Sequence, residues 1–533
     1  MPERRSCSHS EPTSATALTS IEALAGALSR PEAYPRGVDR VDMRQTQMSL
    51  LFFAGDFVYK VKKPVNLGYL DYSSLESRKR FCEQEVQLNR RLCRDVYLGV
   101  VPIVREPQGF RVEGAGQAVE YAVKMRRLPQ ERMLDQLITG GLATHPMMEA
   151  IAARVAGFHA LADATPEIAT FGSIATIRQN TDENFSQTEP SVGHTITPST
   201  HALLRRFTDD FLDTQRDLLE RRVAEDRIRD CHGDLHAAHV CLTDEVCIYD
   251  CIEFNDRFRY GDVASEVAFL AMDLDRLRRH DLSRAFVDSY VAISDDADVS
   301  QLLPFYACYR AIVRGKVEGF KLGDALIPEN DRRAAMWLAR AYFELAKRYA
   351  TGKGLLIVMS GMTASGKSTI AGRLGELLAG TILSSDIVRK QLAGLPPEEH
   401  AYVPFGQGIY SLDWTARTYS ELLRQAAPVL ADGGCAILDA AFLSASERTR
   451  AIATAKQASA RVVLVECVAP REALLERLAR RQSGGTVSDG RPEILEGQFA
   501  NREPVVEFPA SDHFTVDATR DLESIMEETW AQL

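Results

Sequence analysis

A glycine-rich loop between an apolar strand and a helix constrains the fold of this chain more than any other feature. The apolar run LLIVMS at 355–360 is followed by GMTASGKS at 361–368, and TIAGRLGELLAG then continues with helical spacing. This is the G-x-x-x-x-G-K-[ST] pattern of a phosphate-binding loop, in the strand-to-helix context that the pattern requires. A chance glycine-rich turn would lack that context. The segment therefore predicts a P-loop domain with three α/β/α layers and a parallel sheet.

The chemistry of phosphate binding gives each part of this loop a task. Glycines let backbone N–H groups wrap an anion, the helix start adds a positive dipole, and Lys367 neutralises charge. The Ser368 hydroxyl is suited to bind Mg²⁺. We expect ATP to contact Gly361, Met362, Thr363, Ala364, Ser365, Gly366, Lys367, Ser368 and Thr369, with Lys367 also acting in catalysis.

Two aspartates follow later apolar strands of the same domain. Asp386 in TILSSDIVRKQL lies three residues before Arg389, where an acceptor hydroxyl would meet the γ-phosphate. Asp439 ends the strand in GGCAILDAAFL and is placed to hold magnesium-bound water. The alternative for Asp386 is a plain helix cap.

Near the C-terminus, a helix with several arginines runs into a Gly/Ser loop at 482–490. Arg477, Arg480 and Arg481 are typical of a lid that brings arginines to the transferring phosphoryl group, although a solvated face is the alternative. With these motifs, residues 354–533 resemble the P-loop kinases that include gluconate-type, zeta-toxin-like and phage-type polynucleotide 5′-hydroxyl kinases. The resemblance implies Asp386 as the base and Arg389 as the acceptor anchor.

The N-terminal half begins, after a tail and short helix at 1–37, with the element order of a small kinase-type lobe. MSLLFFAGDFVYKVKKPV at 48–65 predicts two strands joined by a turn at Ala54-Gly55-Asp56. A helix follows, with Ser73 and Glu76 at capping-box spacing, and AVEYAVKMRRLP at 118–129 predicts another strand. We place this lobe at 38–128.

Helical patterns dominate residues 129–348, which we interpret as a second, helical lobe. Apolar stripes predict helices at 146–163 and 200–226, whereas the polar stretch 166–200 is expected to be a surface loop. On the first stripe, His159 is expected to be a satisfied core histidine. The segment RYATGKG separates this lobe from the P-loop domain.

The stretch RDCHGDLHAAHV at 229–240 admits two kinds of site. His232, Asp234, His236 and His239 are able to bind zinc, but their spacing matches neither HExxH nor a zinc finger. Phosphoryl transfer instead needs a carboxylate base and further groups for magnesium. Asp234 supplies the base, and Asp250, after a short strand pair, falls at the magnesium-binding position.

The tract HGDLH…IYD…GDVASEVA resembles the catalytic core of aminoglycoside phosphotransferase-like kinases, which have a two-lobed protein-kinase-like fold. The resemblance implies that Lys60 binds the ATP phosphates and that Glu85 holds it, with Lys62 and Glu83 as close alternatives. His239 stands where the family usually has a magnesium-binding asparagine. Imidazole suits Mg²⁺ poorly and Mn²⁺ better. In a third interpretation, His236 or His239 only stabilises the loop by hydrogen bonds.

Composition limits the partners and the compartment. The 533 residues suggest about three compact units. The formal charge of −11, from 63 basic and 74 acidic residues, provides no chain-wide positive field for nucleic acid or an anionic membrane. No export signal or membrane-length apolar run is visible, so we expect a cytoplasmic protein. Its ten cysteines lack CxxC pairs and are expected to be reduced.

As a whole the chain looks like a bacterial fusion of an aminoglycoside phosphotransferase-like half with a P-loop kinase. This implies an ATP- and Mg²⁺-dependent phosphotransferase acting on a hydroxyl of a small molecule. Two alternatives stay open: the N-terminal half is a weak or inactive regulatory module, or the C-terminal half phosphorylates a nucleic-acid end or another macromolecule.

Overall fold

The computed structural model describes residues 21–35, 37–324, 327–396, 407–481 and 492–533. The chain divides into two compact units. The first comprises Met1–Thr139, His232–Asp234 and Ala238–Arg259, and the second comprises Gly140–Cys231, Leu235–Ala237 and Tyr260–Leu533.

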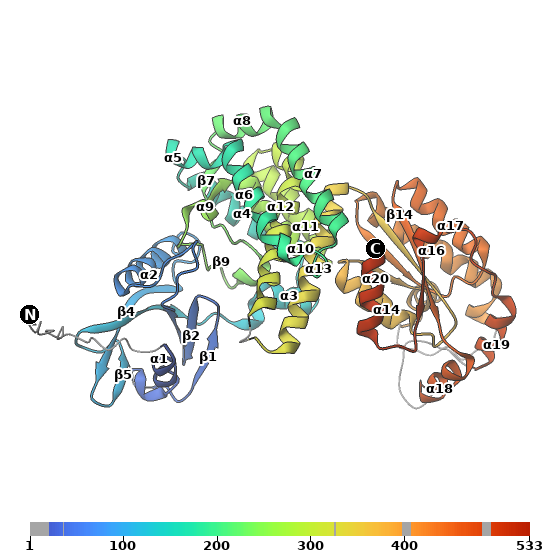
Figure 1. Ribbon diagram of the computed structural model, residues 1–533, viewed down its shortest axis with the longest axis horizontal. Coiled ribbons are helices and arrows are strands. Elements are labelled where there is room, and N and C mark those ends of the chain that lie inside the picture. Colours follow the sequence, from blue (N-terminus) through green and yellow to red (C-terminus); the bar gives the residue numbers. More distant parts are fainter. Residues whose placement is uncertain (1–20, 36, 325–326, 397–406, 482–491) are drawn as a thin grey trace, which may run out of the picture. The chain divides into compact units, whose positions relative to one another are not determined.

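The first unit is built on a six-stranded antiparallel sheet (Figure 1). The strand order is β1 (Val41–Gln45), β2 (Ser49–Ala54), β3 (Phe57–Lys62), β6 (Ala118–Arg126), β4 (Tyr97–Glu106) and β5 (Gly109–Val112). The hairpin predicted at 48–65 is confirmed, and Gly55 at its turn has a φ of +59°, which favours glycine. Because side chains alternate along a strand, Lys60 and Lys62 lie on one face of β3, opposite Tyr59 and Val61.

Helices pack against both faces of this sheet. Helix α1 (Ile21–Leu28) buries Leu24 and Leu28 in one apolar cluster, and α2 (Leu75–Asn89) buries Cys82 and Val86 in the other. The unit also contains α3 (Leu134–Thr139), the antiparallel pair β8 (Val240–Leu242) and β9 (Val246–Ile248), and α9 (Asp256–Arg259).

The predicted cap of α2 was wrong by one residue. Ser74, rather than Ser73, caps the helix, because its hydroxyl accepts the Ser77 N–H at 3.0 Å. The Ser73 hydroxyl donates instead to Asp71 Oδ1 at 2.6 Å. The helix therefore begins one residue later than the Ser73–Glu76 spacing predicts, and the Ser73 side chain is engaged with Asp71 instead.

The first part of the second unit is helical. Its helices are α4 (His145–Leu161), α5 (Pro166–Ala169), α6 (Ile174–Thr188), α7 (Pro198–Thr214), α8 (Arg216–Ala224), α10 (Val263–Arg276), α11 (His280–Ser294), α12 (Asp298–Phe320) and α13 (Glu329–Thr351), with the antiparallel pair β7 (Ile228–Asp230) and β10 (Tyr260–Asp262). His159 is buried and bonded through both ring nitrogens, to Tyr290 Oη and to Glu266 Oε2, each at 2.8 Å. The expectation of a satisfied core histidine is confirmed.

Two expectations about these helices were wrong. The stretch 166–200 is largely helical, because α6 buries a mainly polar face of Thr181, Asn184, Phe185 and Thr188 that a hydrophobic pattern does not reveal. The helix expected at 200–226 is interrupted at Gln215, which has non-helical dihedral angles and separates α7 from α8.

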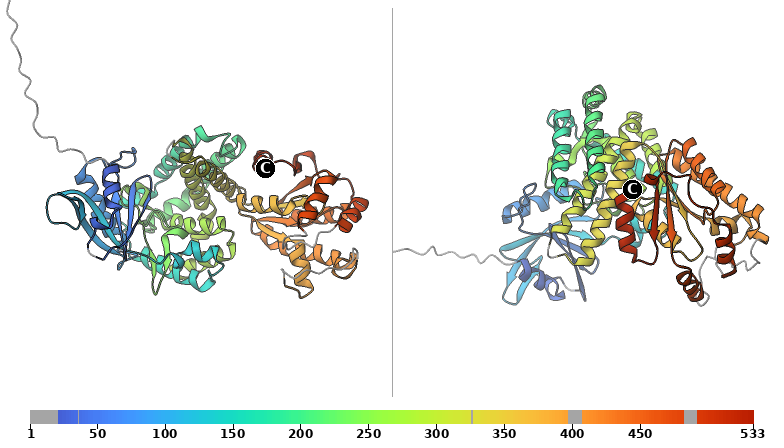
Figure 2. Two further views of the ribbon diagram at one scale, coloured as in Figure 1. Left: turned by 90° about the horizontal axis from the view of Figure 1, so that it is seen from below. Right: turned by 45° about the vertical axis from the view of Figure 1, so that its right-hand side comes forward.

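The second part of this unit is a five-stranded parallel sheet with helices on both faces (Figures 1 and 2). The strand order is β12 (Thr381–Ser384), β13 (Cys435–Asp439), β11 (Leu355–Ser360), β14 (Arg461–Val468) and β15 (His513–Asp517). Helices α14 (Lys367–Leu377) and α20 (Leu522–Gln532) bury one face, and α15 (Ser385–Leu392), α16 (Leu412–Ala431) and α17 (Ala445–Gln457) bury the other. Helices α18 (Arg471–Arg481) and α19 (Pro492–Asn501) complete the domain. The predicted fold class is confirmed.

One pair of cysteines contradicts the expectation of reduced thiols. Cys93, which follows α2, forms a disulfide with Cys247 of β9. The bond joins segments 154 residues apart, a proximity that sequence spacing does not reveal. The other described cysteines are free and buried. Among the helices that the structure describes, none is long and apolar enough to cross a membrane.

Candidate active sites

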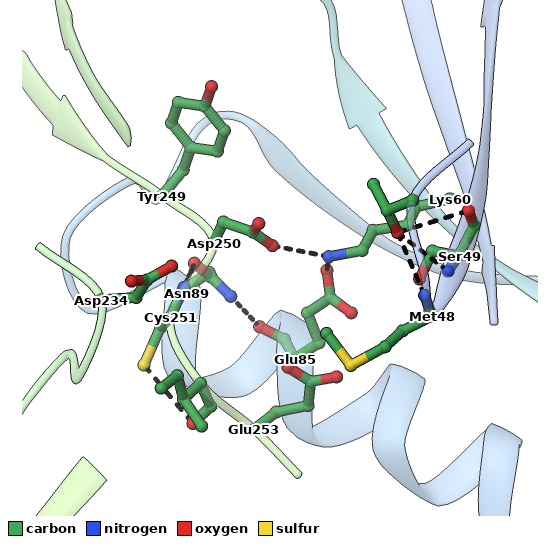
Figure 3. A network of polar contacts seen from close by, with 12 residues as sticks. Met48, Ser49, Lys60, Glu85, Asn89, Asp234, Tyr249, Asp250, Cys251 and Glu253 are labelled. Carbon is green, nitrogen blue, oxygen red and sulfur yellow. Dashed lines mark hydrogen bonds and ion pairs between the residues drawn. The ribbon is translucent and has the colours of Figure 1, made fainter. Parts of the chain in front are cut away.

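The first site centres on Lys60, which lies between two carboxylates (Figure 3). Its Nζ lies 2.6 Å from Asp250 Oδ1 and 2.9 Å from Glu85 Oε1. Strand β3 supplies the lysine, α2 supplies the glutamate, and Asp250 follows β9. These residues, which the sequence predicted to cooperate, are therefore in direct contact.

Lys62 and Glu83, the predicted alternatives to Lys60 and Glu85, are less well placed. Lys62 Nζ also contacts Glu85, at 2.6 Å, and bonds to Glu253, but its side chain is only 1% exposed. Glu83 lies on the surface side of α2, 3.8 Å from Lys79. Lys60 is 13% exposed and contacts Asp250, so it is better placed than Lys62 to meet a ligand.

The charged side chains around Lys60 stabilise one another in their ionised forms. Burial alone would lower the pKa of Lys60, but the carboxylates of Asp250 and Glu85 outweigh it and hold that pKa well above its usual value. Burial opposes ionisation of Asp250 as well, yet Lys60 and His239 lower its pKa. Lysine and carboxylates are therefore all charged at neutral pH.

Asp234 lies in a loop with a tightly constrained backbone. Gly233 has a φ of +86°, and a Cβ there would come within 2.8 Å of the Phe258 carbonyl oxygen. His232 braces the loop, because its Nε2 lies 3.0 Å from the Tyr249 carbonyl oxygen and its Nδ1 accepts the Asp234 N–H at 3.3 Å. Both His232 nitrogens are thus engaged with protein groups, which disfavours its predicted alternative role as a zinc ligand.

His239 lies between the predicted base and the predicted metal ligand. Its Nδ1 is 2.9 Å from the Asp234 carbonyl oxygen, and its Nε2 is 3.6 Å from Asp250 Oδ2. His236 belongs to the second unit, where its ring lies 5.8 Å from that of Phe269. His239 therefore stabilises the loop by hydrogen bonding and also faces Asp250.

Two residues that position Asp250 were missed from the sequence. Asn89 donates to the Glu85 carbonyl oxygen at 2.8 Å and accepts the Cys251 N–H at 2.9 Å (Figure 3). Tyr97 Oη accepts the Asp250 N–H at 3.2 Å. Asn89 follows Glu85 by one helical turn, which is the signal that could have identified it.

The second site is the P-loop between β11 and α14. Gly361 has a φ of +140°, and a Cβ there would lie 2.5 Å from the Cys467 carbonyl oxygen. Gly366 begins α14 with a φ of +90°. The Lys367 ammonium donates to the Met362 carbonyl oxygen at 2.6 Å, so it already lies over the loop that would surround the phosphates.

The predicted magnesium ligands of the P-loop domain are neighbours. Ser368 hydrogen-bonds to Asp439 at the end of β13. Burial raises the pKa of Asp439, while the Ser368 hydroxyl and Lys367 partly counteract that rise and nearby Asp386 adds to it. A cation here would offset the cost of burying this carboxylate.

Asp386 lies in the first turn of α15, whose cap is Ser384, so the alternative that Asp386 is the cap does not hold. Arg389 is buried, with its guanidinium 3.7 Å from Asp386 and stacked 4.7 Å from the centre of the Tyr410 ring. The predicted pair is therefore in contact beside Asp439.

The three predicted lid arginines are in different situations. Arg477 donates to the carbonyl oxygens of Ala364, at 3.3 Å, and Ala518, at 2.6 Å, so it lies against the P-loop. Arg480 is 73% exposed and pairs with Glu476. The Arg481 side chain and the predicted lid loop at 482–490 lie outside the described residues.

Comparison with known proteins gives a family match in the P-loop domain. Residues 356–505 match the AAA domain family. Two solved structures share local likeness: a gluconokinase from Sinorhizobium meliloti (20% identity, 33% of this chain and 89% of the other, TM-score 0.24) and a choline/ethanolamine kinase family protein from Mesorhizobium loti (10% identity, 62% and 99%, TM-score 0.35).

The family match and the loop between β11 and α14 define the class as a protein with a C-terminal P-loop domain. The chain is 32% identical over 465 residues to the uncharacterized protein Rv2004c of Mycobacterium tuberculosis and to its counterpart Mb2027c of Mycobacterium bovis, covering 87% of this chain and 90% of each relative. It belongs to the family of these mycobacterial proteins.

Proposed function

We propose that the chain is an ATP- and Mg²⁺-dependent kinase that transfers the γ-phosphate to a hydroxyl of a small molecule. The observation that carries this proposal is the arrangement around the P-loop. Lys367, the Ser368–Asp439 contact and Asp386 come together at the ends of parallel strands, which is where ligands bind in open α/β sheets.

In this proposal the P-loop binds the phosphates of ATP through its backbone N–H groups, and Lys367 exchanges the Met362 carbonyl for phosphate oxygens. Ser368 and Asp439 would hold Mg²⁺. The ion supplies neutralisation of charge on the phosphates. Arg477 stabilises the loop from the side by its bond to Ala364.

Asp386 acts as the base and takes the proton of the acceptor hydroxyl. The acceptor oxygen forms a bond to the γ-phosphorus while the bond from that phosphorus to the β,γ-bridging oxygen breaks, leaving ADP. Arg389, fixed by Asp386 and the Tyr410 ring, anchors the acceptor.

The N-terminal half is a second nucleotide site in this proposal, with Lys60 on the phosphates and Asp234 as its base. Support comes from the Lys60–Glu85 and Lys60–Asp250 ion pairs. The alternative is a regulatory module that does not turn over. In that case Asp234→Ala leaves ATP consumption intact while Lys367→Ala removes it.

The test is ATP consumption by the full chain across a library of hydroxylated metabolites. We expect an acceptor that raises turnover above water hydrolysis, and Lys367→Ala to lower that turnover at least about 100-fold. Lys353→Ala, at an exposed lysine just before β11, is the matched control. If no metabolite raises turnover but labelled phosphate reaches oligonucleotide ends, the macromolecular alternative replaces the small-molecule proposal.

A further inference from the structure

A cavity in the first unit lies apart from both candidate active sites, where the C-terminal end of α2 passes β4 and β6 (Figure 1). Its volume is about 670 Å³, within the range of about 300 to 1,000 Å³ that is usual for small-molecule sites. Neither Lys60 nor Asp250 lines it. The residues that line it are Arg90, Arg94, Asp95, Tyr97, Leu98 and Arg126.

This cavity is positively charged, although the chain as a whole is acidic. Three arginines and one aspartate give its lining a formal net charge of +2, whereas the whole chain has a formal charge of −11. Among the residues that the structure describes, none forms an ion pair with Arg94 or Arg126. Two guanidinium groups that no carboxylate neutralises therefore line one cavity, and their charge is available to attract an anion.

The wall of the cavity is held in place by hydrogen bonds to the backbone. The Arg90 side chain donates from Nε to the Tyr97 carbonyl oxygen at 2.8 Å and from Nη2 to the Leu98 carbonyl oxygen at 2.7 Å. Arg126 ends β6, and its N–H donates to the Val96 carbonyl oxygen at 2.9 Å. The segment before β4 and the end of β6 are thus fixed to one another, so the cavity is formed before any ligand binds.

We propose that this cavity binds a phosphate monoester of a small molecule. A phosphate monoester carries a charge of about −1.5 to −2 at neutral pH and three acceptor oxygens, so it matches the lining's net charge of +2 better than a single carboxylate does. Guanidinium groups bind phosphate oxygens through paired N–H donors, and Arg94 and Arg126 are suited to this task. Leu98, which is 36% exposed, offers an apolar contact for the rest of the ligand. The site takes no part in the proposed kinase reaction.

The test measures binding to the full-length protein carrying Lys367→Ala, which weakens phosphate binding at the P-loop. Phosphorus NMR follows titrations with inorganic phosphate and with glucose 6-phosphate, and unphosphorylated glucose is added as a competitor. We expect both phosphates to bind at one shared site and glucose not to displace them. In the same background, Arg94→Gln/Arg126→Gln should weaken the binding of both phosphates at least tenfold, because it removes charge-assisted hydrogen bonds. Both replaced side chains are exposed, so this variant should keep the melting temperature of its parent.

The matched control is Arg40→Gln/Arg44→Gln, which removes the same charge from two exposed arginines of the same unit; this variant should bind both phosphates like its parent. Unchanged binding in Arg94→Gln/Arg126→Gln, equal weakening in the control, or no binding of either phosphate would each overturn the proposal. Binding of inorganic phosphate but not of glucose 6-phosphate would overturn the assignment of a monoester in favour of free phosphate. Because ATP turnover is not measured, these results are independent of the kinase assay.

Discussion

The carboxylate of Glu85 is shared by Lys60 and Lys62, one lysine on each oxygen at 2.9 and 2.6 Å. Its side chain is fully buried, so the two ammonium groups reach it inside the protein rather than at the surface. Glu85 therefore ties α2 to β3 and fixes the direction of Lys60 toward Asp250.

Replacing Glu85 should lower the free energy of unfolding of the first unit. Glu85→Gln leaves two buried ammonium groups with one carboxylate fewer, and removing one partner of a buried ion pair costs about 3 to 5 kcal/mol. Urea denaturation followed by circular dichroism measures this loss. Glu83→Gln, on the same helix but 57% exposed, should change stability by less than about 1 kcal/mol. Equal effects of the two variants would refute the shared-carboxylate role.

The contacts of Glu85 with Lys60 and Lys62 also predict how stability changes at low pH. Burial opposes ionisation of Glu85, but Lys60 and Lys62 outweigh it and lower the pKa of this carboxyl. A carboxyl with a folded-state pKa below its unfolded value, about 4.3 for Glu, adds stability above that pH and loses it as pH falls through the folded pKa. The stability difference between wild type and Glu85→Gln should thus be constant above about pH 5.5 and shrink below about pH 4. Melting temperatures across this range provide the check, and a pH-independent difference would count against it.

The P-loop should not tolerate a methyl group at Gly361. Gly361→Ala would place a Cβ 2.5 Å from the Cys467 carbonyl oxygen, on a backbone with a φ of +140°, so we expect ATP affinity to fall at least tenfold. Isothermal titration with a non-hydrolysable ATP analogue measures the change. Gly372→Ala, in α14 where an added Cβ would meet no other part of the chain within 4 Å, is the matched control. It should keep its affinity and gain up to about 1 kcal/mol of stability. Comparable affinities of the two variants would contradict the close approach.

The P-loop could be identified from sequence because its functional residues are contiguous. Residues 361–368 carry the phosphate-binding chemistry in one short stretch of chain, and the flanking strand and helix show their own periodicity. The hairpin holding Lys60 was predictable for the same reason, since its turn and alternation are local.

Contacts between distant segments could not be predicted in this way. Asn89 and Cys251 are 162 residues apart, and nothing in either neighbourhood specifies the other. Helix α6 was missed for a different reason, because its buried face is mainly polar and carries no apolar stripe. The Ser73 hydroxyl bonds to Asp71 while Ser74 caps α2, an arrangement that residue spacing does not encode.

The Cys93–Cys247 disulfide is another contact between distant segments, and it should make the first unit sensitive to reductant. It joins the segment after α2 to β9, three residues before Asp250. Opening a cross-link between residues 154 apart should lower stability by about 2 to 5 kcal/mol, because the unfolded chain regains conformational freedom. Melting temperatures with and without dithiothreitol measure this. Wild type and Cys82→Ala, which lacks only a free buried thiol, should lose stability on reduction, whereas the double variant Cys93→Ala/Cys247→Ala should not respond. If alkylation and mass spectrometry of the unreduced protein find Cys93 and Cys247 both modified, the disulfide is absent and the prediction fails.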